Sequence, residues 1–577
     1  MTSTVASLCS GMGKLLYAGT EMRGTRGQRL LDLTVAWMGE HSGIEKLSLP
    51  ANHPGPGDHM GLPDAFAATP QNLIESWRVA QRIDAATQPG DTVLVIDRDG
   101  LAGVFALEQA MRLPSDRCTS VVIAGESTYL KFQSHAATAS GLSPEDTSAV
   151  DWELASYQWA DVVITPSAWV RDQLAALGVD AVLMNVAGPE SAHIAGPVQD
   201  VWLPEPVVRT SRPGTILRAI NMARLPIPTV TMSEDDGVDE VWVGNTWDAL
   251  DGIRLVHRSR IVRSDEVATP DLIILGDRTA VPSAQTVEHV AAGVPVIVPE
   301  GSTAAGIWHT APVWRDTADL VAVLDGDSLR PTISARAPSL VVPDRSPDED
   351  RARRISVGVP VFRDTRHLDT CLESILNQSV APVEVLIYDD GSNLESVDEA
   401  LHTWVERDDR VRVLTGPNQG VCAARNHMLE SMVGDAFLLV DADDMLHPSF
   451  LKKTSRALQA NPDIVAVSTW TRFFGTYEAV EAKPPFDARV GKRENPIIST
   501  CVLVDMSVRD QGVRFAPDLA WLYCEDWHVW SQIIAAGGRF GLIPEPLAMH
   551  RVHSSGGHRR TDLAYSLGKA RATEPLS

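Results

Sequence analysis

Short apolar runs alternate with amphipathic stretches over the last third of the chain. Apolar residues recur there at helical spacing in three stretches, 368–376, 394–405 and 423–432. Four short apolar runs around them predict strands at 355–362, 383–388, 411–414 and 436–440. The resulting order βαβαβαβ is typical of a parallel sheet with crossover helices.

A second α/β pattern precedes this one. Buried parallel strands are predicted at 92–96, 120–124, 162–165, 272–275 and 294–298, with a helix around 286–292. A proline-containing segment at 204–214 interrupts the apolar periodicity, and proline, serine and charge gather at 325–354. We therefore expect an N-terminal lobe (1–205), a second lobe (206–328), a linker (329–353), a C-terminal domain (354–560) and a tail (561–577).

Length, composition and charge limit what the chain can do. With 577 residues it is too long for one hydrophobic core, and three or four domains of roughly 100 to 200 residues are expected. Its 44% apolar and 22% charged residues are ordinary for folded proteins. A formal net charge of −25 repels polyanions at long range, so we do not expect a nucleic-acid partner.

The sequence predicts neither export nor a membrane span. The six cysteines form no C-x-x-C pair and no zinc-like spacing, which indicates reduced thiols. The first residues lack the long apolar segment of a secretory signal. No run reaches the roughly 20 apolar residues that cross a bilayer. We expect a cytoplasmic protein without a transmembrane segment, leave peripheral contact with the inner membrane face open, and make no prediction of oligomeric state.

Two acidic clusters follow predicted strands of the C-terminal domain. Asp389-Asp390 comes after the second strand, and Asp441-Ala442-Asp443-Asp444 comes after the fourth, which we take to be its neighbour. Ligands bind at the carboxyl ends of such strands. Converging carboxylates repel one another unless a divalent cation neutralises them, which favours Mg²⁺ or Mn²⁺ holding a diphosphate. The D-x-D spacing lets its first and third residues face the same side.

An isolated D-x-D favours a structural interpretation, because acids often end strands as turn formers or helix caps, and Asp444 or Ser392 fits that role alone. Here, however, several motifs occur in order within one domain. They are SVGVPVFRD at 356–364, EVLIYDDGS at 384–392, NQGVCAARN at 418–426, LLVDADDMLHP at 438–448, CEDWHVW at 524–530 and HRVH at 550–553. In these motifs the domain resembles glycosyltransferase family 2, which implies the GT-A nucleotide-binding fold.

The resemblance implies a donor site. Its positions line the base pocket (Pro360, Phe362), contact the nucleoside (Asp389, Asp390), lie beside the donor (Arg425, Asn426) and form the D-x-D (Asp441, Asp443). Asp443 is the better candidate for direct metal contact. His553, ahead of His550, stands where some members add a metal or diphosphate ligand. The implied cofactor is Mn²⁺ or Mg²⁺, and the implied donor is a nucleotide-diphosphate sugar, with a UDP-sugar favoured.

The resemblance also implies an acceptor side at the E-D pair. Asp526 stands where the family places its catalytic base, with Glu525 and Trp527 beside it. A carboxylate opposite the leaving group can take the proton of an attacking hydroxyl, which predicts inversion of configuration. The expected acceptor is a glycan, a lipid-linked group or a protein. The structural alternatives are an acidic first helical turn for the E-D pair and a solvated turn for HRVH.

The N-terminal region resembles glycosyltransferase family 4, whose two lobes form the GT-B fold. The motifs are ADVVITPSAWVRDQLAALG at 160–178, the LMNVAGPE that follows, and VPSAQTVEHVAAGVPVIVP at 281–299. Between Pro282-Ser283 and Glu288 the sequence is shorter than in the family, and the first of its paired glutamates is missing. We expect a GT-B-like region that has lost catalysis or accepts another donor. The alternatives are a bifunctional enzyme and a non-catalytic sugar-binding or scaffold protein.

Overall fold

The structure is a computed structural model that describes the C-terminal part of the chain almost continuously and the N-terminal part in segments. The described residues are 15–20, 44–49, 71–97, 100–124, 144–165, 168–183, 198, 200–204, 213–223, 229–232, 260–263, 270–276, 286, 289–290, 293–300, 302, 304–305, 308, 311–325, 353–497, 499–522, 524–553 and 568–576. The chain divides into two compact units, one of 1–53, 91–102 and 119–343 and the other of 54–90, 103–118 and 344–577.

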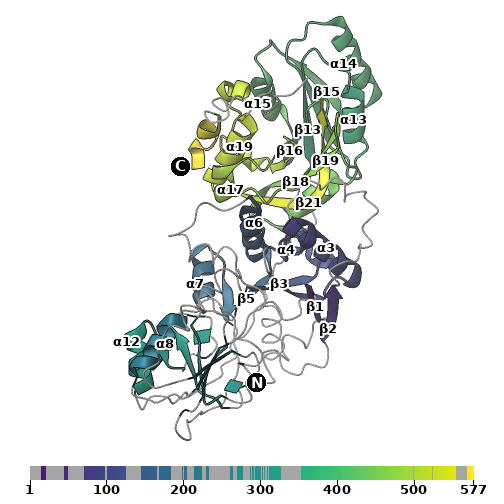
Figure 1. Ribbon diagram of the computed structural model, residues 1–577. Helices are drawn as coiled ribbons and strands as arrows, with labels where there is room; N and C mark the ends of the chain where they lie inside the picture. Colours follow the sequence, from purple (N-terminus) through teal and green to yellow (C-terminus); the bar gives the residue numbers. More distant parts are fainter. Residues whose placement is uncertain are drawn as a thin grey trace. The chain divides into compact units, whose positions relative to one another are not determined.

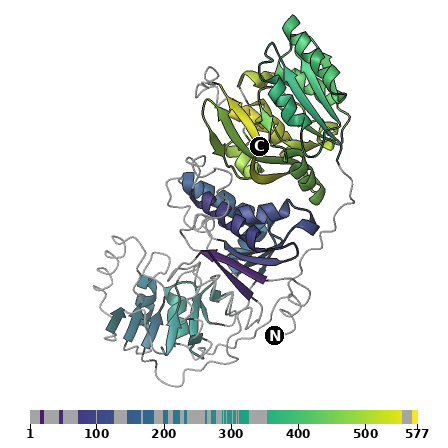
Figure 2. The same ribbon diagram turned by 90° about the vertical axis from the view of Figure 1, so that its right-hand side faces the viewer.

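The first unit contains two six-stranded sheets, in which all the strands are parallel (Figures 1 and 2). One sheet has the order β2 (Ile44–Leu49), β1 (Leu15–Thr20), β3 (Thr92–Asp97), β4 (Thr119–Ala124), β5 (Val162–Thr165), β6 (Ala181–Leu183). The other has the order β12 (Val313–Trp314), β11 (Val296–Pro299), β10 (Leu272–Ile274), β7 (Asp200–Leu203), β8 (Thr229–Met232), β9 (Arg260–Arg263). The predicted parallel strands of this region are confirmed.

The second sheet begins ahead of the boundary predicted at residues 205 and 206. β7 ends at Leu203 and already pairs with β8 and β10. Pro204 therefore directly follows a strand of the second sheet. The helices of this unit whose bounds lie within the described residues are α6 (Pro144–Trp159), α7 (Ala168–Ala176), α8 (Pro213–Met222) and α12 (Thr317–Asp325).

The second unit is built on a nine-stranded mixed sheet. Its order is β15 (Val411–Thr415), β14 (Glu384–Asp389), β13 (Ile355–Val361), β16 (Ala436–Leu439), β20 (Leu503–Asp505), β18 (Ile464–Gly475), β21 (Arg539–Val552), β17 (Met445–Leu446), with β19 (Ala479–Glu481) paired to β18. The first four strands are parallel, as predicted. β20 then pairs antiparallel with both β16 and β18.

The strands that carry the two acidic clusters are not neighbours, so that prediction was wrong. β13 lies between β14 and β16, because the chain pairs β14 with one edge of β13 and later returns to its other edge. The switch in strand order falls between β13 and β16, which is where open α/β sheets bind ligands. The three strands are parallel, so both acidic clusters still lie at the same end of the sheet.

Helices cover both faces of the parallel strands. α13 (Leu368–Leu376) and α14 (Glu395–Arg407) lie on one side, and α15 (Val421–Ser431) and α19 (Glu525–Ala535) on the other (Figure 1). This double cover explains why every residue of β14 is buried. Between residues 353 and 553 the structure also describes the α-helices α16 (Phe450–Ala460), α17 (Ala488–Arg493) and α18 (Ser507–Asp510). None of the helices in the described segments is long and apolar enough to cross a membrane.

A glycine shapes the turn after β14. Gly391 has a φ of 70°, in the left-handed region that other residues avoid. A Cβ atom there would lie 2.7 Å from the backbone nitrogen of Asn418 and 3.0 Å from the carbonyl oxygen of Gly416. The turn that carries Asp389 and Asp390 therefore packs directly against the loop before α15.

Two further helices, α3 (Gln71–Ala86) and α4 (Gly103–Ala110), belong to the second unit. Glu108 of α4 is 7% exposed, and its Oε2 lies 3.8 Å from Nη2 of Arg112. Burial raises the pKa of Glu108 to about 8, although the positive charge of Arg112 opposes the shift. The folded chain therefore binds a proton at this carboxyl more tightly than the unfolded chain does.

Glu108→Gln should stabilise the protein increasingly as the pH rises. Because folding raises the pKa of Glu108 from 4.5 to about 8, the wild type loses folding free energy as the pH rises between those values, whereas glutamine has no charge to bury. The gain in unfolding free energy should be small at pH 5 and on the order of 2–4 kcal/mol at pH 8, measured by urea denaturation. Glu75→Gln, at an exposed position of α3, is the control. A gain that does not depend on pH would contradict the buried charge.

Gly391→Ala should destabilise the C-terminal domain by about 3 kcal/mol, because it combines an unfavourable φ with a backbone clash. Gly512→Ala is the matched control, since Gly512 has a φ of 90° but no atom within 4 Å of an added Cβ. The control should cost only about 1 kcal/mol. Equal losses in the two variants, measured by urea denaturation, would show that the contact with the loop at Asn418 has no energetic weight.

Candidate active site

The loops at the carboxyl ends of β13 and β14 are tied to each other. The backbone N–H of Asp390 donates to the carbonyl of Val361 at 2.9 Å. The N–H of Arg363 donates to the hydroxyl of Ser392 at 2.8 Å. These two bonds hold the loop that follows the first strand against the turn that follows the second.

The two residues predicted to line a base pocket lie on this first loop. Pro360 is half-buried near the end of β13, and Phe362, just beyond the strand, is 42% exposed. The guanidinium of Arg363 lies 4.9 Å from the centre of the Phe362 ring. An exposed aromatic face next to a cation suits a planar ligand, and the role in base binding stays a prediction.

Asp389 and Asp390, predicted to contact a nucleoside, are both buried and bonded to the protein. Asp390 accepts backbone N–H bonds from Gln419 at 2.9 Å and from Gly420 at 2.8 Å, one on each carboxylate oxygen. Asp389 accepts bonds from the N–H and the hydroxyl of Ser392. The pair therefore fixes the turn after β14 and the start of α15, and a contact with a nucleoside stays a prediction.

Arg425 of α15 joins the D-x-D motif to the E-D motif. Its Nη2 lies 2.8 Å from Oδ1 of Asp441, and its Nη1 lies 3.1 Å from Oε1 of Glu525. Only 4% of the arginine side chain is exposed. Burial lowers the pKa of Arg425, but the negative charges of Asp441 and Glu525 outweigh it and hold this pKa above its ordinary value.

Asn426, the next residue of α15, fastens the chain ahead of α19. Its amide nitrogen donates to the carbonyl of Phe515 at 2.9 Å, and its amide oxygen accepts the N–H of the same residue at 3.0 Å. Both hydrogen bonds of this side chain thus go to the backbone of Phe515. The position of Asn426 beside a donor stays a prediction.

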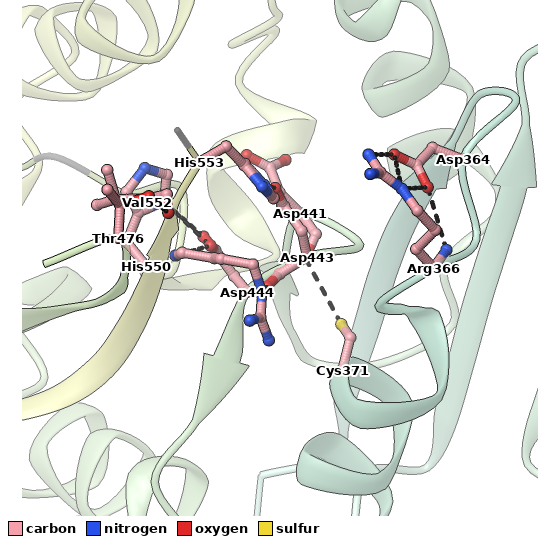
Figure 3. Close-up of polar contacts among 11 residues, drawn as sticks. Asp364, Arg366, Cys371, Asp441, Asp443, Asp444, Thr476, His550, Val552 and His553 are labelled. Carbon is pink, nitrogen blue, oxygen red and sulfur yellow. Dashed lines mark hydrogen bonds and ion pairs between the residues drawn. The ribbon is translucent and has the colours of Figure 1, made fainter. Parts of the chain in front are cut away.

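The second acid of the D-x-D meets the histidine chosen from HRVH. Nε2 of His553 lies 2.7 Å from Oδ2 of Asp443, and Figure 3 shows these side chains close to Asp441. About a third of each side chain is exposed, 33% for His553 and 36% for Asp443. The structure thus brings His553 into contact with Asp443, and the predicted role of His553 as a metal or diphosphate ligand stays a prediction.

Asp444, the residue after Asp443, is bonded to the same HRVH segment that carries His553. It is fully buried and accepts bonds from Nδ1 of His550 at 3.0 Å and from the N–H of Arg551 at 2.9 Å. Burial raises the pKa of Asp444, whose hydrogen bond and negative charge in turn raise the pKa of His550 against the effect of burial. His550 thus pairs with a buried carboxylate while 33% of its own side chain is exposed, and residues 550–552 form the end of β21 instead of a solvated turn.

The residues present fit a divalent cation held partly by the substrate. In the regions that the structure describes, no three or more His, Cys, Asp or Glu side chains enclose a metal position. Asp443 and His553 nevertheless offer one carboxylate and one imidazole with exposed surface, a donor set that suits Mn²⁺. Ions of this class often take only one or two protein ligands and complete their shell with water and phosphate oxygens.

Asp526 lies in the first turn of α19, immediately after the glutamate that Arg425 binds. Its Oδ1 accepts the N–H of Trp527 at 2.7 Å, and its Oδ2 accepts an amide N–H of Asn495 at 3.3 Å. The negative charge of Asp526 also contributes to the raised pKa of Arg425, after burial and the stronger effects of the two bonded acids. The structural alternative of an acidic first helical turn is therefore correct, and it is compatible with a base.

The predicted acceptor contact of Trp527 does not fit its surroundings. Its side chain is 1% exposed and its indole N–H donates to the carbonyl of Gly491 at 2.9 Å. Trp530 is likewise 2% exposed. These rings pack in the core of the domain because they face inward from α19, so neither presents a surface on which an acceptor could stack.

Two residues of the site escape the motif analysis. Phe515 lies 5.3 Å from the Arg425 guanidinium, and Arg551 donates from Nε to the carbonyl of Asp443 at 3.0 Å. Arg551 lies within the HRVH motif, but the motif analysis considers only its two histidines as ligands. Phe515 lies in no motif, and only the fold brings it to Arg425.

The N-terminal positions singled out by the resemblance to family 4 lie mostly outside the described residues. These are Pro282, Ser283, Glu288 and the segment after 183. The described remainder forms β5, α7, β11 and the short stretches 286 and 289–290. The GT-B fold of this region therefore stays a prediction.

Comparison with known proteins bears on the C-terminal domain. Residues 356–515 match the family model Glycosyl transferase family 2. An uncharacterized glycosyltransferase of Haemophilus influenzae is 37% identical over 100 residues, which are 17% of this chain and 40% of that protein. Glycosyltransferase GlyG of Streptococcus pneumoniae is 29% identical over 120 residues, 21% of this chain and 40% of that protein. The chain thus spans less than half the length of these curated relatives.

A solved structure is similar with a lower sequence identity than these relatives. The crystal structure of S. aureus TarS 1-349 in complex with UDP shares 18% identity, with 34% of this chain and 60% of that chain covered and a TM-score of 0.30. A score this low supports no conclusion about the fold. The family model, which compares sequences, confirms that the C-terminal domain is similar to glycosyl transferase family 2 over residues 356–515.

Proposed function

We propose that the C-terminal domain transfers a sugar from a nucleotide-diphosphate donor to an acceptor hydroxyl, with inversion of configuration. The observation that carries this proposal is the ion-pair chain in which Arg425 lies 2.8 Å from Asp441 and 3.1 Å from Glu525. It brings the motif that the resemblance assigns to the donor next to the motif that it assigns to the base. Two motifs far apart in the sequence thus share one site at the carboxyl end of the sheet.

Asp526 acts as the base in this proposal. It takes the proton of the acceptor hydroxyl while the hydroxyl oxygen bonds to the anomeric carbon. The bond between that carbon and the diphosphate oxygen breaks, and its electron pair leaves with the nucleoside diphosphate. Bonds from Asn495 and from the N–H of Trp527 orient the carboxylate. Attack opposite the leaving group inverts the anomeric centre.

Asp443 and His553 would hold the cation, with Asp441 beside them. When bound, a divalent cation stabilises the negative charge of the departing diphosphate as a Lewis acid. The Asp444–His550 pair and the bond from Arg551 to the carbonyl of Asp443 hold the loop that carries Asp443 in place.

The donor is proposed to be a UDP-sugar, and the acceptor a glycan, a lipid-linked group or a protein. The exposed Phe362 ring, with Arg363 beside it, offers a face for the base. The turn fixed by Asp389 and Asp390 places this face at the same end of the sheet as the D-x-D motif.

Asp526→Asn should lower the transfer rate by about 10²- to 10⁴-fold, because an amide cannot accept the proton of the hydroxyl. Affinity for the nucleoside diphosphate, measured by calorimetry, should stay within about threefold of wild type, since the substitution removes no group assigned to the donor. Asp510→Asn, at an exposed position of α18, is the control. Undiminished transfer by D526N would remove Asp526 as the base.

Asp443→Ala and His553→Ala should each weaken Mn²⁺ binding by at least about tenfold, because each removes a proposed ligand. The measurement is a Mn²⁺ titration in the presence of UDP, followed by electron paramagnetic resonance of the free ion. His402→Ala on α14, whose side chain is 74% exposed, controls for the loss of a surface histidine. If both variants bind Mn²⁺ as wild type does, the Asp443–His553 contact is an ion pair without a ligand role.

A further inference from the structure

The guanidinium of Arg425 forms its hydrogen bonds with carboxylates of the protein. Nη2 binds Asp441 and Nη1 binds Glu525, while the aromatic ring of Phe515 lies 5.3 Å from the guanidinium carbon. With 4% of its side chain exposed, Arg425 offers almost no surface to a donor molecule. This geometry differs from the contact beside the donor that the family resemblance implies.

Two buried atoms of this cluster have no hydrogen-bond partner among the residues that the structure describes. They are Nε of Arg425 and Oε2 of Glu525. A buried polar group without a partner costs stability, so the cluster is held by its charges and not by complete hydrogen bonding. Such a cluster persists only where the surrounding structure fixes the charged groups in place.

The two acids that Arg425 binds belong to the two ends of the proposed site. Asp441 follows β16 and begins the D-x-D motif. Glu525 is the first residue of α19 and is bonded directly to Asp526 through the chain. A planar guanidinium can bind two carboxylates at once with fixed geometry, which the single ammonium of a lysine cannot do. Arg425 therefore sets the position of the first turn of α19 relative to the D-x-D loop.

We propose that Arg425 is a positioning residue that holds Asp526 in register with the D-x-D loop, without touching the donor. This inference rests on the proposed function and adds to it a division of roles. Asp443 and Asp526 face the reactants, and Arg425 fixes the distance between the elements that carry them.

The kinetic test compares Arg425→Lys with wild type. Because a displacement of about 1 Å at a reacting group can lower a rate about 100-fold, kcat of R425K should fall by that order while KM for the donor changes less than about threefold. A donor-binding arginine would give the opposite split, a raised KM with a nearly unchanged kcat, and that result would overturn the proposal.

Glu525→Gln keeps the test decisive if R425K fails to fold. The variant leaves Arg425 paired with Asp441 and weakens only the link to α19, so kcat should fall with KM for the donor unchanged. An E525Q enzyme with wild-type kcat would contradict the inference. Arg509→Lys is the matched control, because Arg509 binds the carbonyls of Leu429 and Met432 at the other end of α15.

Hydrogen exchange supplies a readout that does not need turnover. The N–H of His528 donates to the carbonyl of Cys524 at 3.1 Å and reports on the first turn of α19. Peptides over 524–530 should exchange at least about tenfold faster in R425K than in wild type and R509K, since the turn loses its anchor. Unchanged exchange overturns the inference. If the wild type transfers no sugar, the proposed function fails, and exchange alone then decides the structural role of Arg425.

Discussion

One buried cation lies between two carboxylates in the C-terminal domain, and the arrangement of the site depends on this interaction. In a low dielectric an unpaired charge is costly, so the buried guanidinium of Arg425 depends on its ion pairs with Asp441 and Glu525. The three residues come from α15, from the loop after β16 and from α19. The ion pairs therefore fix three separate elements at the carboxyl end of the sheet.

Around this cation the acids divide by exposure. Asp389, Asp390 and Asp444 are 2%, 4% and 0% exposed, and their oxygens accept bonds from the turn after β14, the start of α15 and the end of β21. Asp441 and Asp443 keep 35% and 36% of their side chains exposed. The acids that look alike in the sequence thus differ in the structure: three are buried and bonded to the protein, and two are more exposed. Of these five acids, Asp441 and Asp443 have the side-chain surface that a ligand could contact.

Much of the C-terminal domain is predictable from the sequence, because its parallel strands are buried on both faces and appear as short apolar runs. The order of strands is less accessible. The two acidic clusters suggest that β14 and β16 are neighbours, whereas the return of the chain to the far edge of β13 separates them. The antiparallel strand β20 is not predicted either, since it has only three residues and no acidic cluster marks its end.

Individual side chains show the same limit. The motifs name Asp443 and His553 separately as candidate ligands, and the structure places the two side chains in contact. The acceptor role of Trp527 follows from the same kind of motif, but its ring faces the core. The direction of a side chain depends on how α19 packs, which a motif does not contain. Phe515 reaches Arg425 only through the fold, so no local pattern could reveal it.

Release of nucleoside diphosphate from a panel of nucleotide sugars, with and without Mn²⁺, tests the central claim most directly. A transferase site should release the diphosphate from one donor class by slow hydrolysis or by transfer, and should do so faster when the cation is present. A folded protein that binds nucleotide sugars but releases no diphosphate from any of them, with or without Mn²⁺, would contradict the account and favour a binding or scaffold role.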